Sequence, residues 1–73
     1  MTKEFMLNIL LADGYTRKEA DKAVNTYGFM IYEDIEQAAK DYSMTLEEIR
    51  NVEQPGLKAV EYQGKTYIIC NPL

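Results

Sequence analysis

Apolar residues recur every three or four positions in several stretches of the chain, which is the spacing of one helix face. The clearest stretch is 35–52, whose apolar positions are Ile35, Ala38, Ala39, Tyr42, Leu46, Ile49 and Val52. Asp34 and Gln37 flank the start of its first half at the spacing of a capping box, and Thr45 opens its second half in the same way. The pattern predicts a helix from about Asp34, a tight turn near Ser43 and a second helix that begins at Thr45.

Two further helices are predicted before the middle of the chain. The first covers 2–13, and its core stripe is formed by Phe5, Met6, Ile9 and Leu10. Leu7 and Leu11 lie on the opposite side of this helix and form a second apolar strip. The second covers 16–28, starts with a capping box, and buries Ala20, Ala23, Val24 and Tyr27.

Three runs of strand-forming residues favour β-structure. They cover 29–32, 57–62 and 65–70, and the last two flank Gln63-Gly64, which is typical of a two-residue hairpin turn. Pairing Tyr62 with Lys65 gives this hairpin two apolar faces, one with Val60, Tyr62, Tyr67 and Ile69 and the other with Leu57, Ala59, Ile68 and Cys70. The expected fold is α+β and mainly α, with four short helices, a C-terminal β-hairpin and a possible short third strand, in a single domain of residues 1–73.

Residues 35–52 resemble the helix-turn-helix unit of small DNA-binding domains. The matching positions are Ala39 in the first helix, Ser43 where the pattern prefers glycine, Met44 in the turn, and Ile49 and Val52 in the second helix. The order helix, strand, helix, helix, hairpin further resembles the winged-helix family, in which the hairpin is the wing. The resemblance implies a winged helix-turn-helix-like unit at 17–70, with 2–13 as an extra N-terminal helix.

Residues 4–42 are also similar to ubiquitin-associated (UBA-like) three-helix domains. The similarity lies in Leu10-Leu-Ala-Asp13-Gly14-Tyr15, in Glu19-Ala20 with Ala23-Val24, and in Asp34-Ile-Glu-Gln-Ala38-Ala39. Asp13 stands where that family has a methionine, and the connection at 29–33 is longer than in the family. This second resemblance implies binding of the ubiquitin type.

Negative charge is concentrated in the second half of the helical region. The chain has 73 residues, 47% hydrophobic and 27% charged, with a net charge of -4, a composition typical of a globular domain. Residues 1–27 balance Lys3, Arg17, Lys18 and Lys22 against Glu4, Asp13, Glu19 and Asp21. Residues 33–54 contain two bases, Lys40 and Arg50, and seven acids, Glu33, Asp34, Glu36, Asp41, Glu47, Glu48 and Glu53. Their acidic strip, Glu36, Glu47, Glu48 and Glu53, either fits a basic groove on another protein or only keeps the domain soluble.

The residue types exclude several classes of chemistry. The chain has no histidine and a single cysteine, Cys70, which rules out an internal disulfide, the common zinc sites and every histidine-dependent catalytic arrangement. The acids lack the spaced ligands and glycine of a calcium loop. The longest apolar run, Phe5–Ala12, is interrupted by Asn8 and is too short to cross a bilayer. We expect a soluble cytoplasmic protein without catalytic residues, cofactor, metal or membrane attachment.

The tyrosines leave two interpretations open. Tyr27 and Tyr42 lie on predicted core stripes, and Tyr15 is expected to fold back onto the first helix. Tyr62 and Tyr67 share one face of the hairpin, where they either pack in the core or stack on a partner.

The leading functional prediction is a small non-catalytic regulator or inhibitor that binds another protein on this winged-helix-like scaffold. A monomer of this size seldom exposes two neighbouring leucines, so Leu7 and Leu11 either form a contact surface or are covered by the hairpin or by 29–32. If they are exposed, antiparallel pairing of the N-terminal helices gives a homodimer. The candidate interface residues are Leu7, Leu11, Glu47, Glu48, Arg50 and Asn51.

The alternative prediction is a dimeric helix-turn-helix transcriptional regulator that binds DNA. The candidate contacts are Arg50 and Asn51 at bases, Gln54 beside them, and Lys58 and Lys65 at phosphates. The second helix of the pair, however, brings three acids and one base toward a polyanion, a net charge of -2. Charge therefore disfavours DNA as the partner.

Overall fold

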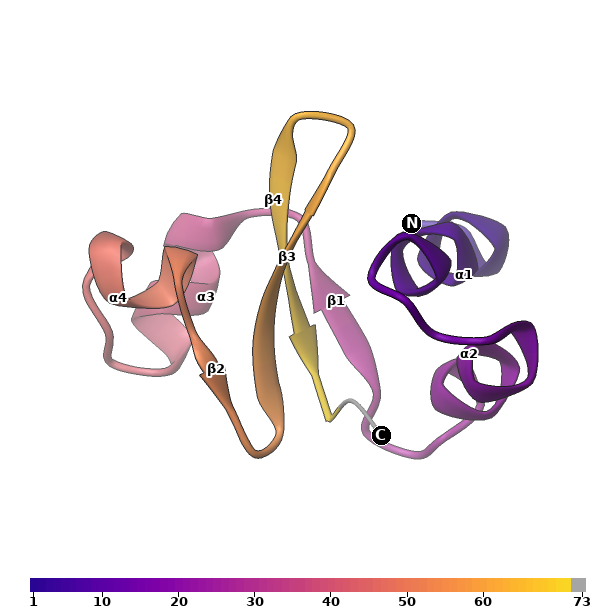
Figure 1. Ribbon diagram of the computed structural model, residues 1–73. Helices are drawn as coiled ribbons and strands as arrows, with labels where there is room; N and C mark the ends of the chain where they lie inside the picture. Colours follow the sequence, from indigo (N-terminus) through magenta and orange to yellow (C-terminus); the bar gives the residue numbers. More distant parts are fainter. Residues whose placement is uncertain (72–73) are drawn as a thin grey trace.

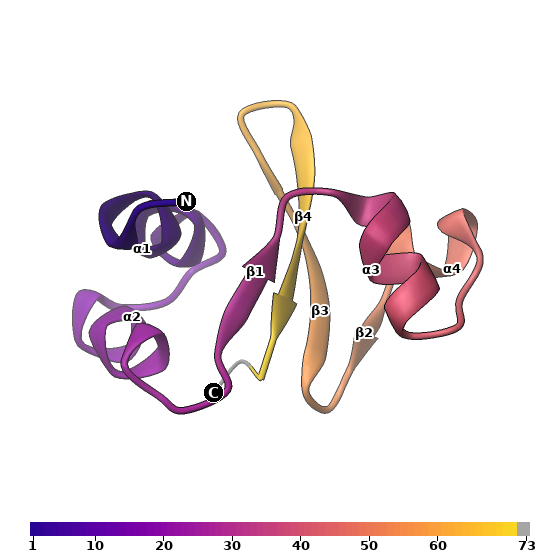
Figure 2. The same ribbon diagram turned by 180° about the vertical axis from the view of Figure 1, so that it is seen from behind.

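An antiparallel sheet of four strands forms the middle layer of the structure, a computed structural model that describes residues 1–71 (Figures 1 and 2). Along the chain the elements are α1 (Lys3–Ala12), α2 (Arg17–Val24), β1 (Met30–Tyr32), α3 (Ile35–Asp41), α4 (Leu46–Arg50), β2 (Glu53–Gln54), β3 (Leu57–Tyr62) and β4 (Lys65–Cys70). The strands lie in the order β1-β4-β3-β2. Helices α1 and α2 cover one face of the sheet, and α3 and α4 cover the other. The molecule therefore has three layers, with a helix pair on each side of the sheet.

The predicted mainly α, winged helix-turn-helix-like fold with a C-terminal hairpin is wrong. The sheet has four strands because β2 pairs with β3, and β1 pairs with the other side of β4. A winged-helix domain would pack α2 with α3 and α4 in one helical core, whereas here α2 lies on the opposite face of the sheet. The reason is the hairpin itself, since both of its faces are apolar and each needs a cover. The same separation leaves residues 4–42 in two layers rather than in one three-helix domain.

The predicted register of the hairpin is confirmed. Tyr62 pairs with Lys65 across a two-residue turn in which Gln63 and Gly64 have φ values of 50° and 77°. Positive φ at both positions is the conformation of a type I′ turn, whose twist matches that of the flanking strands.

Each face of the sheet contributes to its own hydrophobic core. Toward α1 and α2 the buried residues are Leu7, Ile9, Leu10, Ala20, Ala23, Val60, Tyr67 and Ile69. Toward α3 and α4 they are Ala38, Ala39, Ile49, Val52, Leu57, Ile68 and Cys70. Ile68 and Ile69 are neighbours in β4, both fully buried, and they point into opposite cores. Strand β4 is therefore the shared wall of the two cores.

The two helix pairs share one turn design. In each pair the second helix starts with a reciprocal capping box, formed by Thr16 with Glu19 and by Thr45 with Glu48. The turn before it contains a residue in the left-handed conformation, Gly14 with φ 98° and Ser43 with φ 54°. The next N–H donates to a carbonyl of the first helix, from Tyr15 to Leu10 at 3.1 Å and from Met44 to Ala39 at 2.8 Å. These residues recur at one constant offset, so a similar local unit covers each face of the sheet.

Burial differs from expectation at the first helix pair. Leu7, expected on the far side of α1, is only 3% exposed, whereas Leu11 is 36% exposed. Helix α1 packs against both α2 and the sheet, so its buried arc is wider than a single stripe. Tyr27, expected in the core, is 92% exposed because α2 ends at Val24, before the stripe reaches it.

Candidate interaction surfaces

The leucine surface predicted on the N-terminal helix does not form. Leu7 lies in the core between α1 and the hairpin, together with Val60 and Tyr67. The alternative in which the hairpin covers Leu7 is therefore the one that the structure shows. Leu11 remains partly exposed, but a homodimer through antiparallel N-terminal helices loses the paired leucines on which that prediction depended.

The predicted acidic strip is divided between the two faces of the sheet. Glu53 pairs with Lys58 across β2 and β3, and directly paired residues of an antiparallel ladder project to the same face. Lys58 Nζ lies 2.8 Å from a carboxylate oxygen of Asp13, at the end of α1, so this is the face that α1 and α2 cover. Glu53 therefore lies on the opposite side from the acids of α3 and α4.

Helices α3 and α4 still carry a surplus of negative charge. Residues 34–51 contain two bases against five acids, a net charge of -3. Three of these acids have partners in the structure: Asp34 caps α3, Asp41 accepts hydrogen bonds from Tyr32 and Gln37, and Glu48 belongs to a capping box. Within the described residues 1–71, the carboxylates of Glu36 and Glu47 have neither an ion-pair nor a hydrogen-bond partner. These two charges are available to a binding partner.

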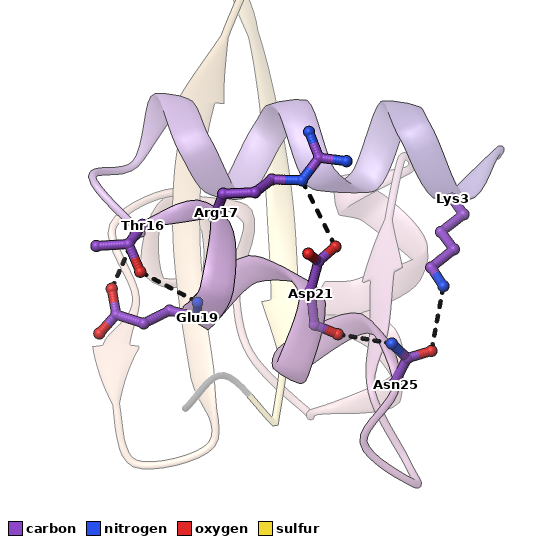
Figure 3. A network of polar contacts seen from close by, with 6 residues as sticks. All are labelled: Lys3, Thr16, Arg17, Glu19, Asp21 and Asn25. Carbon is purple, nitrogen blue, oxygen red and sulfur yellow. Dashed lines mark hydrogen bonds and ion pairs between the residues drawn. The ribbon is translucent and has the colours of Figure 1, made fainter.

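The charges of the first helix pair are balanced within that pair (Figure 3). Arg17 Nε lies 3.6 Å from a carboxylate oxygen of Asp21, and Lys3 Nζ donates to Asn25 Oδ1 at 3.3 Å, which links the two helices. Residues 1–27 contain four acids and four bases. The molecule therefore has one electrically balanced helical layer, α1–α2, and one acidic helical layer, α3–α4.

Four of the predicted interface residues do lie together, at α4. Glu47, Glu48, Arg50 and Asn51 are all exposed. Two of them also have local roles, because Glu48 caps the start of the helix and Asn51 donates its side-chain N–H to the backbone oxygen of Glu47 at 3.1 Å. Leu46, at the start of the same helix, is 39% exposed. The surface of α4 thus combines an exposed leucine with charged side chains.

The candidate DNA-contacting residues lie on two faces of the molecule. Arg50 and Asn51 end α4, and Gln54 follows in β2. Lys58 and Lys65 project from the opposite face of the hairpin, where Lys58 is already bonded to a carboxylate. Helix α4 is five residues long and packs on the sheet, so it does not stand out as a helix that could enter a groove.

A cluster that sequence reasoning missed lies on the α3–α4 face of the sheet, over β1 and the last residue of β4. The Tyr32 hydroxyl donates to Asp41 at 2.7 Å, the Tyr42 hydroxyl donates to Cys70 Sγ at 3.3 Å, and the two rings meet edge to face with centroids 6.3 Å apart. Tyr42, expected in the core, is 41% exposed, and Met30, the strand partner of Cys70, is 44% exposed. The sequence does contain a signal for an exposed apolar side chain at Met30. All four residues of 29–32 are apolar, whereas a strand with one buried face needs only every second residue to be apolar.

These hydrogen bonds change the titration of both tyrosines. The bond to Asp41 raises the pKa of Tyr32 from its ordinary value of 10.0 to about 12, and the bond to Cys70 raises the pKa of Tyr42 to about 12. A phenol whose pKa is higher in the folded chain than in the unfolded chain stabilises the fold fully below pH 10, and this contribution is lost as the pH rises toward 12.

We therefore expect stability to fall steeply in alkali. Three further groups act in the same direction, because burial raises the pKa of Tyr15 and of Cys70, and the bond to Asp13 raises the pKa of Lys58. The urea midpoint should be clearly lower at about pH 12 than at about pH 9, and the double variant Tyr32→Phe/Tyr42→Phe should lose less between these two pH values. Equal wild-type midpoints at both would count against the two tyrosine hydrogen bonds.

A shallow polar cleft lies beside the Lys58–Asp13 ion pair. Its volume is about 500 Å³, and its walls are formed by Asp13, Gly14, Tyr15, Glu19, Lys22 and Lys58. Lys58 is bonded to Asp13, and Glu19 accepts the backbone N–H of Thr16 at 2.8 Å. Three of the charged groups that line the cleft, on Asp13, Glu19 and Lys58, therefore have partners within the protein.

Residues 1–71 hold no group of three His, Cys, Asp or Glu side chains that could bind a metal ion. Within the same residues, every helix is too short or too polar to span a membrane. No protein-family model, curated protein or solved structure matches the chain at a significant level.

Proposed function

We propose that this protein is a small non-catalytic regulator or inhibitor that binds another protein through the acidic α3–α4 layer. The observation that carries the proposal is the uneven charge of the two helical layers, which is zero over residues 1–27 and -3 over residues 34–51. The complementary partner surface is basic, because opposite potentials across an interface speed the encounter and select the partner.

The exposed side of α4 has the mixture of residues that a protein interface uses. Leu46 is 39% exposed, and Glu47 and Arg50 lie on the same short helix. Interfaces commonly surround an apolar centre with a polar, charged rim. Glu36, in the first turn of α3, adds a second carboxylate without a partner in residues 1–71. This combination supports a protein as the ligand of the layer.

A DNA-binding role has less support from the same geometry. Placing α4 against a duplex brings Glu47 and Glu48 toward the phosphates. Neutralisation of phosphate charge by cations provides most of the non-specific affinity for DNA. Lys58, the candidate cation nearest to β2, is held by Asp13 on the other face of the sheet. The acidic layer therefore opposes DNA binding rather than assisting it.

Removing the two carboxylates without partners is expected to weaken capture of the binding partner. The double variant Glu36→Gln/Glu47→Gln takes two charges from the acidic layer and leaves the capping residues unchanged. With the tagged protein as bait in a nuclease-treated lysate of the source cells, we expect this variant to retain at least about fivefold less of the protein that the wild type captures.

Glu4→Gln is the matched control. Glu4, Glu36 and Glu47 each occupy the first turn of a helix, so all three replacements remove a similar favourable interaction with the helix dipole. Capture by Glu4→Gln should equal that of the wild type. Equal losses with Glu4→Gln and Glu47→Gln would refute the choice of surface. In a parallel lysate without nuclease, recovery of DNA and of no protein would refute protein binding itself.

A further inference from the structure

The two edge strands of the sheet differ in how their outer edges are protected. Strand β2 consists only of Glu53 and Gln54, and Pro55 follows it. Short length, charge and proline are common means by which proteins prevent an edge from pairing with another chain. Strand β1 is also short, but residues 29–32 include neither a charge nor a proline. No other strand within residues 1–71 pairs with the outer edge of β1, so this edge is open to an incoming strand.

The register shows which backbone groups of β1 point outward. Asn71 N–H donates to the carbonyl of Gly56 at 2.8 Å, so the odd-numbered residues at this end of β4 hydrogen-bond to β3 and the even-numbered ones to β1. Met30 and Tyr32 pair with even-numbered residues of β4, which directs their backbone groups toward that strand. The N–H and C=O of Ile31 therefore point away from the sheet.

Apolar side chains flank this edge. Met30 is 44% exposed and Tyr42 is 41% exposed. Both lie next to Cys70, because Met30 pairs with it across β1 and β4 and its Sγ accepts the hydrogen bond from the Tyr42 hydroxyl. Tyr27, three residues before Met30, is 92% exposed. Within residues 1–71, three of the six exposed large apolar side chains are thus Met30 on β1, Tyr27 just before it and Tyr42 beside Cys70.

The charge around this edge distinguishes between two candidate partners, a second copy of this chain and a basic strand of another protein. Glu33 and Asp34 follow β1 directly, and Asp41 accepts the hydrogen bond from the Tyr32 hydroxyl. Lys65, 3.9 Å from Glu33, offsets one of these charges. A second copy of this chain, with its net charge of -4, would bring the same acids to the interface. A strand with lysine or arginine would instead place opposite charges side by side.

We infer that the outer edge of β1 binds an extended segment of the partner protein that has an apolar residue and a lysine or arginine two positions apart, so that both side chains project to the α3–α4 face of the sheet. The main chain of the segment pairs with Ile31, its apolar side chains cover Met30 and Tyr42, and its cations lie near Asp34 and Asp41. Strand addition at a sheet edge gains affinity from main-chain hydrogen bonds and specificity from alternate side chains. This inference rests on the proposed function and adds that the partner binds through an extended segment.

A titration of the nitrogen-15-labelled protein with two capped peptides tests the inference. One peptide of about eight residues has valine and lysine in turn at its odd-numbered positions and threonine at the others, and the other peptide has glutamate in place of lysine. With the basic peptide, exchange of the Ile31 amide hydrogen should slow at least about tenfold, and the acidic peptide should leave it unchanged. Unchanged exchange at Ile31 under saturation with the basic peptide, or equal protection by both peptides, would overturn the inference.

Two variants with the same added charge provide the control. Met30→Lys places a cation on the edge and should weaken binding of the basic peptide at least about fivefold more than Leu11→Lys does. Leu11 suits the comparison because it is 36% exposed against 44% for Met30 and lies on α1, outside the acidic layer. Equal weakening by both variants would show attraction by overall charge alone and overturn strand addition. If the protein without peptide forms a dimer that protects the Ile31 amide, the edge binds a second copy of this chain, and the inference of a segment from another protein is overturned.

The same variants separate this inference from the proposed function. If Met30→Lys captures the partner as the wild type does while Glu36→Gln/Glu47→Gln captures less, binding through the acidic layer stands and strand addition is wrong. If Met30→Lys loses the partner and Leu11→Lys keeps it, strand addition is supported. If all three variants capture the partner as the wild type does, both proposals are wrong.

Discussion

Replacing either Ile68 or Ile69 by alanine is expected to lower the free energy of unfolding by about 3 kcal/mol. Both side chains are fully buried, but Ile68 points toward α3 and α4 whereas Ile69 points toward α1 and α2. Each replacement therefore leaves a cavity in a different core. Because small domains are stabilised by only about 5 kcal/mol, either variant should be close to the limit of folding. Urea denaturation followed by circular dichroism measures the change.

The control for this pair is Leu46→Ala, which shortens a side chain that is 39% exposed and should cost less than about 1 kcal/mol. A sheet covered on one face only, as in a winged-helix domain, would make only one of the two isoleucines costly. A loss below about 1 kcal/mol for either Ile68→Ala or Ile69→Ala would therefore disprove the three-layer arrangement.

Breaking the ion pair between Lys58 and Asp13 is expected to cost about 1–2 kcal/mol. The side chains are only 32% and 17% exposed, and Nζ lies 2.8 Å from the carboxylate oxygen, so either charge stays partly buried when its partner is removed. Lys58→Met keeps the aliphatic stem, and Asp13→Asn keeps the shape of the carboxylate. The double variant should cost less than the sum of the two single variants, because it leaves neither charge unpaired.

Lys65→Met is the matched control for this ion pair. Lys65 lies 3.9 Å from Glu33, and both side chains are more than half exposed, so its loss should cost less than about 0.5 kcal/mol. Chemical denaturation near neutral pH measures all four variants. Equal effects of Lys58→Met and Lys65→Met would show that Lys58 is an ordinary surface cation, free for phosphate contacts as the DNA-binding prediction required.

Local elements could be predicted from the sequence because their determinants are local. The capping boxes that start at Thr16 and Thr45 and the turn at Gln63-Gly64 each depend on about four residues, and all three are confirmed. Strand β2 could not be predicted in this way. Glu53 and Gln54 are polar and have no alternating pattern, and they form a strand only because the following turn returns the chain along them.

The placement of the helices on the sheet could not be read from periodicity. An apolar stripe shows that a helix is covered on one side, but it does not say which face of the sheet covers it. The winged-helix prediction therefore placed α2 with α3 and α4, although the two apolar faces of the hairpin, correctly predicted, already required a cover on each side. Both helix pairs also have small buried residues and the same kind of N-cap, so the sequence does not show which face of the sheet each pair covers.

The candidate site was only partly predictable for a related reason. Glu53 continues the acidic pattern of α4 in the sequence, and Tyr27 continues the apolar stripe of α2, but each lies beyond the last residue of its helix. Beyond the end of each helix the chain changes direction, so the helical period no longer predicts which way a side chain points. Glu47 and Arg50 lie within α4, and their exposure on one surface was predicted correctly.

The most direct test of the proposed function is the dissociation constant of the purified partner at increasing salt concentration, for the wild type and for Glu36→Gln/Glu47→Gln. We predict that the wild type loses affinity as salt screens the acidic layer. The variant should bind at least about fivefold more weakly at low salt and depend less on salt. The same dissociation constant and the same salt dependence for both proteins would contradict the claim that the acidic α3–α4 layer holds the partner.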